Sequence, residues 1–478
     1  MAFSFMSHSF SRRAGSGSFF SLLVIGIWAA CSLFAGGKVA ASPAPLTLTR
    51  IPISSGNTPF AASAVNLAAK GYIEEEYLVD GTANIYEYDA NKEVQVQTPN
   101  VAYQTRIMIR RPISTRKFNG TVIFEWMNPT AGFDIDFLWH FTNRKILEDG
   151  YIWVGITVRP NAIGFMQALY PARYASMHMA DAGQIYDAVS RLGVLLRDRH
   201  ASQNPLAAFN VRQMIGTGYS QTAIYLVTYI NEFHKDATLS DGSPAFTGYL
   251  VGSAFGRARQ INSTSSDYFD ERRFITPPVP VMRTQTETEV EGGSATARVP
   301  DSDLYRTYEW AGTSHADTEI LQLTQEVIER DIPGAPAPEC INTINPIAQS
   351  PFLRSALVNL NLWIRFGIKP PPAVLINLDD EGAVIRDEHN NATASQRPPG
   401  LEAPLGTHLP FNDGTGPCFL SGSFFPFDEA KLDALYPTHG RYVSKVTHAA
   451  SRLALERYLL LEDAWQYVTD AAHSSVGK

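Results

Sequence analysis

The fold is decided by the stretch QMIGTGYSQTAIYLV, which runs from Gln213 to Val227. Its residues up to Gly218 are mostly apolar or small, which is typical of a strand buried on both faces. After Ser220 the apolar residues have helical spacing. A sharp turn between a buried strand and a helix exposes the side chain at its corner, which here is Ser220. The alternative is an ordinary glycine-rich turn before a helix. Residues elsewhere in the chain are needed to distinguish these two interpretations.

Segments on both sides of this turn alternate between strand and helix patterns. Runs of apolar and β-branched residues predict strands at residues 120–128, 151–160, 211–218, 246–254, 279–287 and 304–313. Amphipathic patterns predict helices at residues 134–150, 179–198 and 219–234. This alternation predicts the α/β class, with a mostly parallel central sheet flanked by helices. Residues 72–89 and 101–112 alternate with period two instead, which predicts two paired strands near a sheet edge.

The pattern changes after Asp317. A helix is predicted at residues 350–367, a polar and mostly irregular stretch at 378–417, and further helices in the closing segment. We therefore expect a single α/β domain over residues 42–478, with a core at about 72–330 and a C-terminal extension of helices and loops at about 331–478. The extension is either a cap or a coat wrapped on the sheet.

The N-terminus has the pattern of a secretory signal peptide over residues 1–41. Arg12 and Arg13 precede an apolar run, Phe19–Phe34, and small residues end in Val39-Ala40-Ala41. An uncleaved anchor is the alternative, but the run is shorter than the roughly 20 residues that a membrane span needs. No later apolar run is long enough to span a membrane. The pattern predicts a secreted or periplasmic protein that begins at Ser42 and is not held in the membrane.

Composition excludes some classes of partner and site. The net charge of -8 and the pI of about 5.8 give no basic patch suited to nucleic acid. No cluster of histidine or cysteine has the spacing of a zinc site, so no metal is expected. Cys340 and Cys418 are the cysteines that remain after signal cleavage. In an oxidising compartment they are candidates for a disulfide, with two buried free thiols as the alternative.

Ser220 can act as a nucleophile if a base and an orienting acid accompany it. In the fold that uses a serine at such a turn, the chain order is serine, acid, histidine. His315 follows a predicted strand directly, unlike the other histidines after Ser220, and is the expected base. The acid should follow the preceding strand, where Glu287 and Glu289 stand. We favour Glu289, because the aliphatic Val290 follows it, and keep Glu287 as the second choice.

The same chemistry needs N–H donors for the oxyanion that forms on attack. One is expected from the backbone of Gln221, directly after the serine. The second is expected from the loop after the strand at 120–128, where Met127 or Asn128 is favoured because Pro129 has no N–H. Thr222 stands where the G-x-S-x-G motif has its second glycine.

Successive blocks of the sequence resemble the alpha/beta hydrolase domain-containing proteins, a group of large exported bacterial proteins. These blocks are GYIEEEYLVDGTANIY, VIFEWMNPTAGFD, GTGYSQTAIYLVTYIN, RTQTETEV and YEWAGTSHAD, and the resemblance extends from about Gly71 to the C-terminus. It implies the α/β-hydrolase fold and hydrolysis of carboxylic esters, of small molecules or polymers, through Ser220, an acid and His315. It implies no metal and no organic cofactor.

Two alternatives to ester hydrolysis stay open. Amide or lactone hydrolysis would use the same residues. The stretch NNATASQRPPG at residues 390–400 lacks glycines that the family usually has near the site. This departure leaves room for a non-catalytic binding protein with the same fold.

Overall fold

The computed structural model of the protein describes residues 44–265 and 271–478. The predicted signal peptide lies outside these residues. The described residues form one compact unit.

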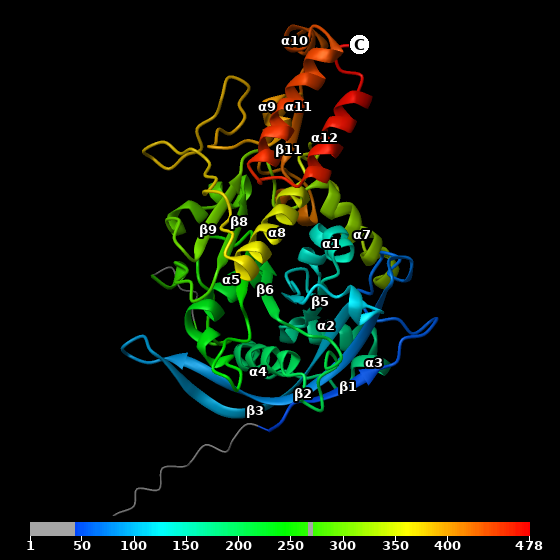
Figure 1. Ribbon diagram of the computed structural model, residues 1–478, viewed down its shortest axis with the longest axis vertical. Helices are drawn as coiled ribbons and strands as arrows, with labels where there is room; N and C mark the ends of the chain where they lie inside the picture. Colours follow the sequence, from blue (N-terminus) through cyan, green and yellow to red (C-terminus); the bar gives the residue numbers. More distant parts are fainter. Residues whose placement is uncertain (1–43, 266–270) are drawn as a thin grey trace, which may run out of the picture. The chain divides into compact units, whose positions relative to one another are not determined.

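Nine strands of the described residues form one sheet (Figure 1). From one edge to the other they are β1 (Thr47–Ile51), β2 (Tyr72–Tyr88), β3 (Val94–Pro112), β5 (Ile152–Ile156), β4 (Thr121–Trp126), β6 (Gln213–Tyr219), β7 (Gly248–Gly252), β8 (Val281–Thr286) and β9 (Tyr305–Trp310). The strands from β5 to β9 are parallel to one another, whereas β1, β2 and β3 pair antiparallel and β3 is antiparallel to β5. The predicted mostly parallel sheet is confirmed, and so is the strand pair near its edge. Strand β1, which lies outside that pair, had not been predicted.

The central strands are buried on both faces, as their apolar runs require. Every residue of β4, β5, β7 and β8 is buried. Alternate residues of β4 belong to two different apolar clusters: Val122 and Phe124 to one, Ile123 to the other. The sheet therefore has a packed layer on each face.

Helices of the chain cover these two faces (Figure 1). Side chains of α4 (Ile185–Arg197) and α5 (Gln221–Thr228) join one apolar cluster, and side chains of α1 (Phe137–Asp149) and α8 (Ser350–Phe366) join the other. The unpredicted helices include α2 (Pro160–Leu169), α3 (Pro171–Tyr174) and α7 (Thr318–Asp331). No helix among the described residues combines the length and the apolar character that crossing a bilayer requires.

Two buried arginines of β3 fix the loop that follows β4. Arg106 pairs with Glu76 of β2 at 2.9 Å and with Asp134 at 3.1 Å. Arg110 pairs with Asp136, which lies in the same loop. Because removing one partner of a buried pair leaves an uncompensated charge, these contacts strongly disfavour movement of the loop.

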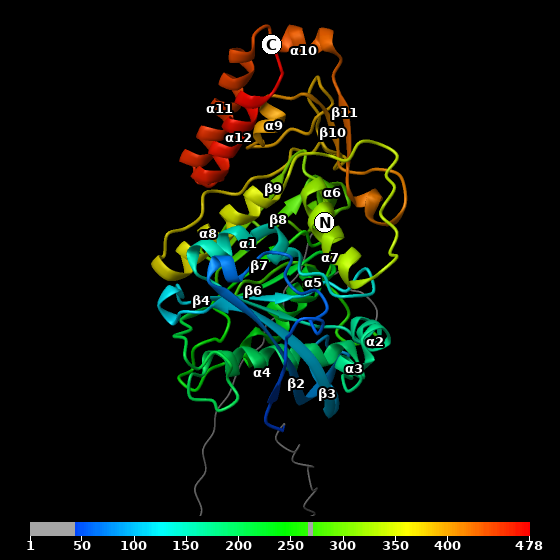
Figure 2. The ribbon, with the colours of Figure 1, turned by 90° about the vertical axis from the view of Figure 1, so that its right-hand side faces the viewer.

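The C-terminal segment, residues 331–478, adds short elements and three helices beyond α8 (Figure 2). These are α9 (Pro399–Glu402), a two-stranded sheet of β10 (Gly406–Leu409) and β11 (Ser423–Pro426), and the helices α10 (Glu429–Leu435), α11 (His439–Leu455) and α12 (Leu461–His473). Helices α11 and α12 pack side by side in both views. Cys340 and Cys418 are joined in a disulfide, with their Cα atoms 5.2 Å apart.

Candidate active site

Ser220 occupies the turn between β6 and α5. Its backbone angles are φ 57° and ψ -120°, so a non-glycine residue lies at positive φ. Such a conformation costs free energy and persists where the surrounding structure imposes it, often at an active site. A serine at positive φ between a strand and a helix has the backbone geometry that the sequence predicts for a nucleophile elbow.

The residues around Ser220 explain how the sharp turn is held. A Cβ on Gly218 would lie 2.9 Å from the carbonyl carbon of Thr222, so glycine is needed where the strand passes the helix. The Thr222 hydroxyl accepts a hydrogen bond from the N–H of Tyr219 and donates to its carbonyl, both at 3.1 Å. Thr222 therefore stabilises the turn through these two hydrogen bonds.

Helix α6 (Glu287–Glu291) begins directly after β8 and carries the predicted acid. Glu289 Oε1 lies 2.5 Å from Nδ1 of His315, in the loop after β9. Its Oε2 accepts hydrogen bonds from the N–H of Thr286 at 2.8 Å and from the Thr286 hydroxyl at 2.7 Å. Every oxygen of this carboxylate is therefore engaged, and one of them orients the imidazole.

The Glu289 carboxylate is held in its charged form. Its complete burial acts to raise the pKa, but the neighbouring His315 and the hydrogen bonds from Thr286 outweigh burial and bring the pKa below the usual range. A charged carboxylate at Nδ1 keeps the proton on that nitrogen. Nε2 of His315 is then the nitrogen that can accept a proton.

Glu287, the second choice for the acid, has different partners. Its Oε1 pairs with Arg386 at 2.7 Å, and its Oε2 accepts from the N–H of Gly312 at 2.6 Å. Burial raises the pKa of Glu287 to about 7, although Arg386 opposes the shift. This carboxylate ties the C-terminal segment to the start of the loop that carries His315.

The loop after β9 places His315 beside the elbow. The His315 carbonyl accepts a hydrogen bond from the Tyr219 hydroxyl at 2.6 Å and another from Gln349 Nε2 at 3.0 Å. The rings of Tyr219 and His315 lie 5.1 Å apart, centre to centre. Tyr219 immediately precedes Ser220, so the loop that carries His315 contacts the residue before the predicted nucleophile. His315 is 4% exposed and Ser220 is 9% exposed.

A family model for the alpha/beta hydrolase domain matches residues 42–469 of the chain. The chain belongs to this family. The predicted resemblance and the predicted fold class are thereby confirmed, since the sheet and its flanking helices agree with the match.

Solved structures resemble the hydrolase domain more distantly. They include an alpha-beta serine hydrolase homologue from Coxiella burnetii, with 14% identity over 48% of this chain and 92% of that chain and a TM-score of 0.27. A thermostable esterase from Pseudomonas putida has 13% identity over 52% of this chain and 75% of that chain, with a TM-score of 0.29. No sequence among curated proteins matches. At these identities and scores, the assignment rests on the family model.

The expectation that the N–H of Met127 or Asn128 supplies the second oxyanion donor is wrong. The N–H of Met127 donates to the carbonyl of Ile156 at 3.1 Å, and that of Asn128 donates to Ile135 at 2.8 Å. Neither N–H is free for an oxyanion, because both hold the loop after β4 in place. The side chain of Asn128 instead donates to the carbonyl of Tyr219 at 2.7 Å and supports the elbow. Gln221 is the first residue of α5, where a backbone N–H has no partner within the helix.

Sequence reasoning missed the residues that hold the histidine loop from a distance. Gln349 and Arg386 come from the C-terminal segment, and nothing local in the sequence marks them. Thr286 did carry a signal, because T-x-x-E over Thr286 and Glu289 is the capping-box pattern that starts a helix. That pattern distinguishes Glu289 from Glu287.

Among the residues that the structure describes, no group of three or more histidine, cysteine, aspartate or glutamate side chains is placed to hold a metal ion.

Proposed function

We propose that this hydrolase-family protein cleaves carboxylic esters through Ser220, His315 and Glu289. The observation that carries the proposal is the 2.5 Å contact between Glu289 and His315 on a loop that reaches the strained turn at Ser220. A serine, a histidine and a buried carboxylate in this relation form the nucleophile, base and orienting acid of acyl transfer. The three lie after the C-terminal ends of β6, β9 and β8, the edge of a parallel sheet at which ligands bind.

In the first step the Ser220 hydroxyl attacks the ester carbonyl while His315 Nε2 takes its proton. The tetrahedral intermediate collapses to an acyl-serine, and His315 returns the proton to the departing alcohol. Water then attacks the acyl group with His315 again as base, which releases the acid and restores Ser220. Glu289 stays charged throughout and stabilises the imidazolium that forms in each step.

The backbone N–H of Gln221 is proposed to donate to the oxyanion. It follows the serine directly and begins α5, so its N–H lies at the positive end of the helix dipole. A preorganised donor of this kind contributes because it meets charge that develops in the transition state.

We propose further that the protein is exported after removal of residues 1–41. The disulfide between Cys340 and Cys418 supports this, because such bonds persist in oxidising compartments.

Hydrolysis of p-nitrophenyl esters across a range of acyl lengths tests the proposed activity. We expect turnover by the wild-type protein and a fall in kcat of about 10⁴-fold or more in Ser220→Ala and in His315→Ala. Activity that both variants retain would contradict the proposal. Absence of turnover together with absence of Ser220 labelling by a fluorophosphonate would favour a non-catalytic binding protein.

A further inference from the structure

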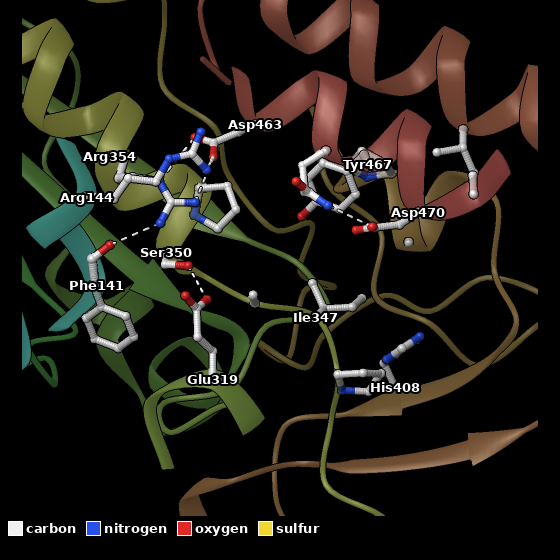
Figure 3. Close-up of a pocket in the computed structure, with 18 of the residues that line it drawn as sticks. Phe141, Arg144, Glu319, Ile347, Ser350, Arg354, His408, Asp463, Tyr467 and Asp470 are labelled. Carbon is white, nitrogen blue, oxygen red and sulfur yellow. Dashed lines mark hydrogen bonds and ion pairs between the residues drawn. The ribbon is translucent and has the colours of Figure 1, made fainter. Parts of the chain in front are cut away.

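A cavity of about 760 Å³ lies between the C-terminal segment and helices α1, α7 and α8 (Figure 3). Ser220, Glu289 and His315 are not among the residues that line it. We propose that this cavity is a second binding site, for an uncharged apolar molecule that carries a hydroxyl or N–H group and donates it to His408. Nothing in the proposed ester hydrolysis requires such a site.

The cavity has the size and lining of a site for a small organic molecule. Pockets that bind such molecules usually measure about 300–1,000 Å³ and are mostly apolar with a few placed polar groups. Here Phe141 of α1, Ile347, and Tyr442 and Val446 of α11 are buried side chains of the lining. An apolar ligand would remain in contact with them on several sides.

His408 supplies the polar group. Its Nδ1 lies 2.9 Å from Oδ1 of Asn345, and that oxygen also accepts from the N–H of Ile347 at 3.1 Å. The Asn345 amide nitrogen donates to the carbonyl of Gly312 at 2.7 Å, which fixes Oδ1 as an acceptor. The proton of the imidazole must therefore be on Nδ1.

The other imidazole nitrogen, Nε2, is consequently a hydrogen-bond acceptor. Burial lowers the pKa of His408 to about 4, so the ring is neutral near pH 7 and Nε2 carries a lone pair. No hydrogen bond within residues 44–265 and 271–478 engages Nε2. The side chain is 3% exposed and lines the cavity, so Nε2 is open to a hydrogen-bond donor there, which a bound ligand can supply in place of water.

Three charged groups of the lining already have partners of opposite charge. In Figure 3, Arg144, Arg354 and Asp463 lie on one side of the cavity, with Ile347 and His408 on the other. Arg354 binds both oxygens of Asp463, at 2.7 and 3.2 Å, and Arg144 pairs with Glu148 at 3.3 Å. Because these three charges already have partners, a charged ligand would have to compete with existing ion pairs. Glu319 and Asp470 of the lining accept hydrogen bonds from Ser350 and Gln466, and their charge would repel an anion.

The segment of residues 345–350 separates the cavity from the histidine loop. Ile347 and Ala348 line the cavity, whereas Gln349 donates to the His315 carbonyl at 3.0 Å and Asn345 donates to the Ser314 hydroxyl at 2.9 Å. The two sites are thus neighbours with a wall in common, and binding in the cavity can be measured without the chemistry at Ser220.

Calorimetric titration of the full chain carrying Ser220→Ala tests the proposal, because this variant cannot form an acyl-enzyme at Ser220. The probes are 1-decanol and decyl methyl ether, which share an alkyl chain and differ in the hydroxyl donor. We expect one molecule of the alcohol to bind per chain, with about tenfold higher affinity than the ether, since the ether cannot donate to His408. Equal affinities, or no binding of the alcohol, would overturn the proposal.

A cavity-filling variant locates the binding. Val446→Phe, added to Ser220→Ala, places a ring in the cavity and is expected to reduce alcohol binding below detection. Circular dichroism and the melting temperature show whether this variant folds, and if it does not, the comparison of alcohol and ether still decides. Undiminished binding by a folded Val446→Phe variant would place the alcohol elsewhere and overturn the proposal. Neither measurement depends on ester hydrolysis, so failure of the proposed function would not affect them.

Discussion

Helix α6 carries two buried glutamates that serve opposite regions of the molecule. Glu289 faces the histidine loop and has its pKa lowered, whereas Glu287 faces the C-terminal segment and has its pKa raised to about 7. Both side chains are fully buried, so burial cannot explain the difference. The partners of a buried carboxylate therefore decide whether it is charged.

The two carboxylates differ in the positive charge and the hydrogen-bond donors that their partners offer them. Glu289 has His315 on one oxygen and two donors from Thr286 on the other. Glu287 shares the charge of Arg386 with Glu291, which lies 2.5 Å from the same guanidinium nitrogen and raises the Glu287 pKa by repulsion. One glutamate is therefore suited to orienting a base, and the other to holding two segments together.

Replacing each carboxylate by its amide should give the largest difference in kcat between the two glutamates. In Glu289→Gln the side chain can donate to Nδ1 of His315, which moves the ring proton to Nε2 and removes the base. We expect kcat for a p-nitrophenyl ester to fall about 10⁴-fold, the size of effect found when a triad carboxylate becomes an amide. Glu287→Gln is the matched control, with an expected change of less than about tenfold. If the two variants lost equal activity, the assignment of roles would be wrong.

The dependence of stability on pH should separate the two glutamates by sign. The folded-state pKa of Glu287, about 7, exceeds its ordinary value of 4.5, so the folded state binds more protons between these values. Its contribution to the free energy of unfolding is therefore present below about pH 4.5 and falls as the pH rises toward 7. The folded-state pKa of Glu289 is lowered, so its contribution is present above about pH 4.5 and is lost as the pH falls.

Urea denaturation at several pH values between about 2.5 and 8 measures these contributions. The wild-type free energy of unfolding minus that of Glu287→Gln should decrease by at most about 3 kcal/mol as the pH rises from 4.5 to 7.5. The corresponding difference for Glu289→Gln should increase with pH below about 4.5. Slopes of the same sign would show that the two carboxylates do not differ as described.

A smaller effect is expected from the donor that supports Glu289. Thr286→Ala removes the hydroxyl that donates to Oε2 at 2.7 Å and leaves the backbone N–H in place. We expect a loss of about 1 kcal/mol in stability, as for other helix caps, and a fall in kcat of about tenfold. Thr286→Ser keeps the hydroxyl and should retain near wild-type values of both. Full activity in Thr286→Ala would mean that the backbone donor alone suffices.

Much of the sheet, and the places of Ser220, Glu289 and His315 after its strands, could be predicted because their signals are local. Ser220 lies between a buried strand and a helix, and His315 follows a strand, in positions that the strand pattern reveals. Choosing Glu289 over Glu287 also has a local basis in the pattern from Thr286 to Glu289.

The remainder depends on contacts that no local pattern encodes. The N–H groups of Met127 and Asn128 are occupied by Ile156 and Ile135, and which strand neighbour or loop residue accepts them follows from the tertiary fold. Arg386 lies 99 residues after Glu287 in the chain, within a stretch whose composition indicates loop. The cavity at His408 likewise forms where α1, α7, α8 and the C-terminal helices meet, so its lining is scattered along the sequence.

The rate at which a fluorophosphonate labels Ser220 tests the central claim most directly. Intact-mass and peptide measurements on the wild type, Glu287→Gln and Glu289→Gln give both the site and the rate. The account predicts labelling at Ser220 in all three, within about tenfold of the wild-type rate for Glu287→Gln and slower by about 100-fold or more for Glu289→Gln. Labelling at another residue, or slow labelling of Glu287→Gln beside a normal rate for Glu289→Gln, would contradict it.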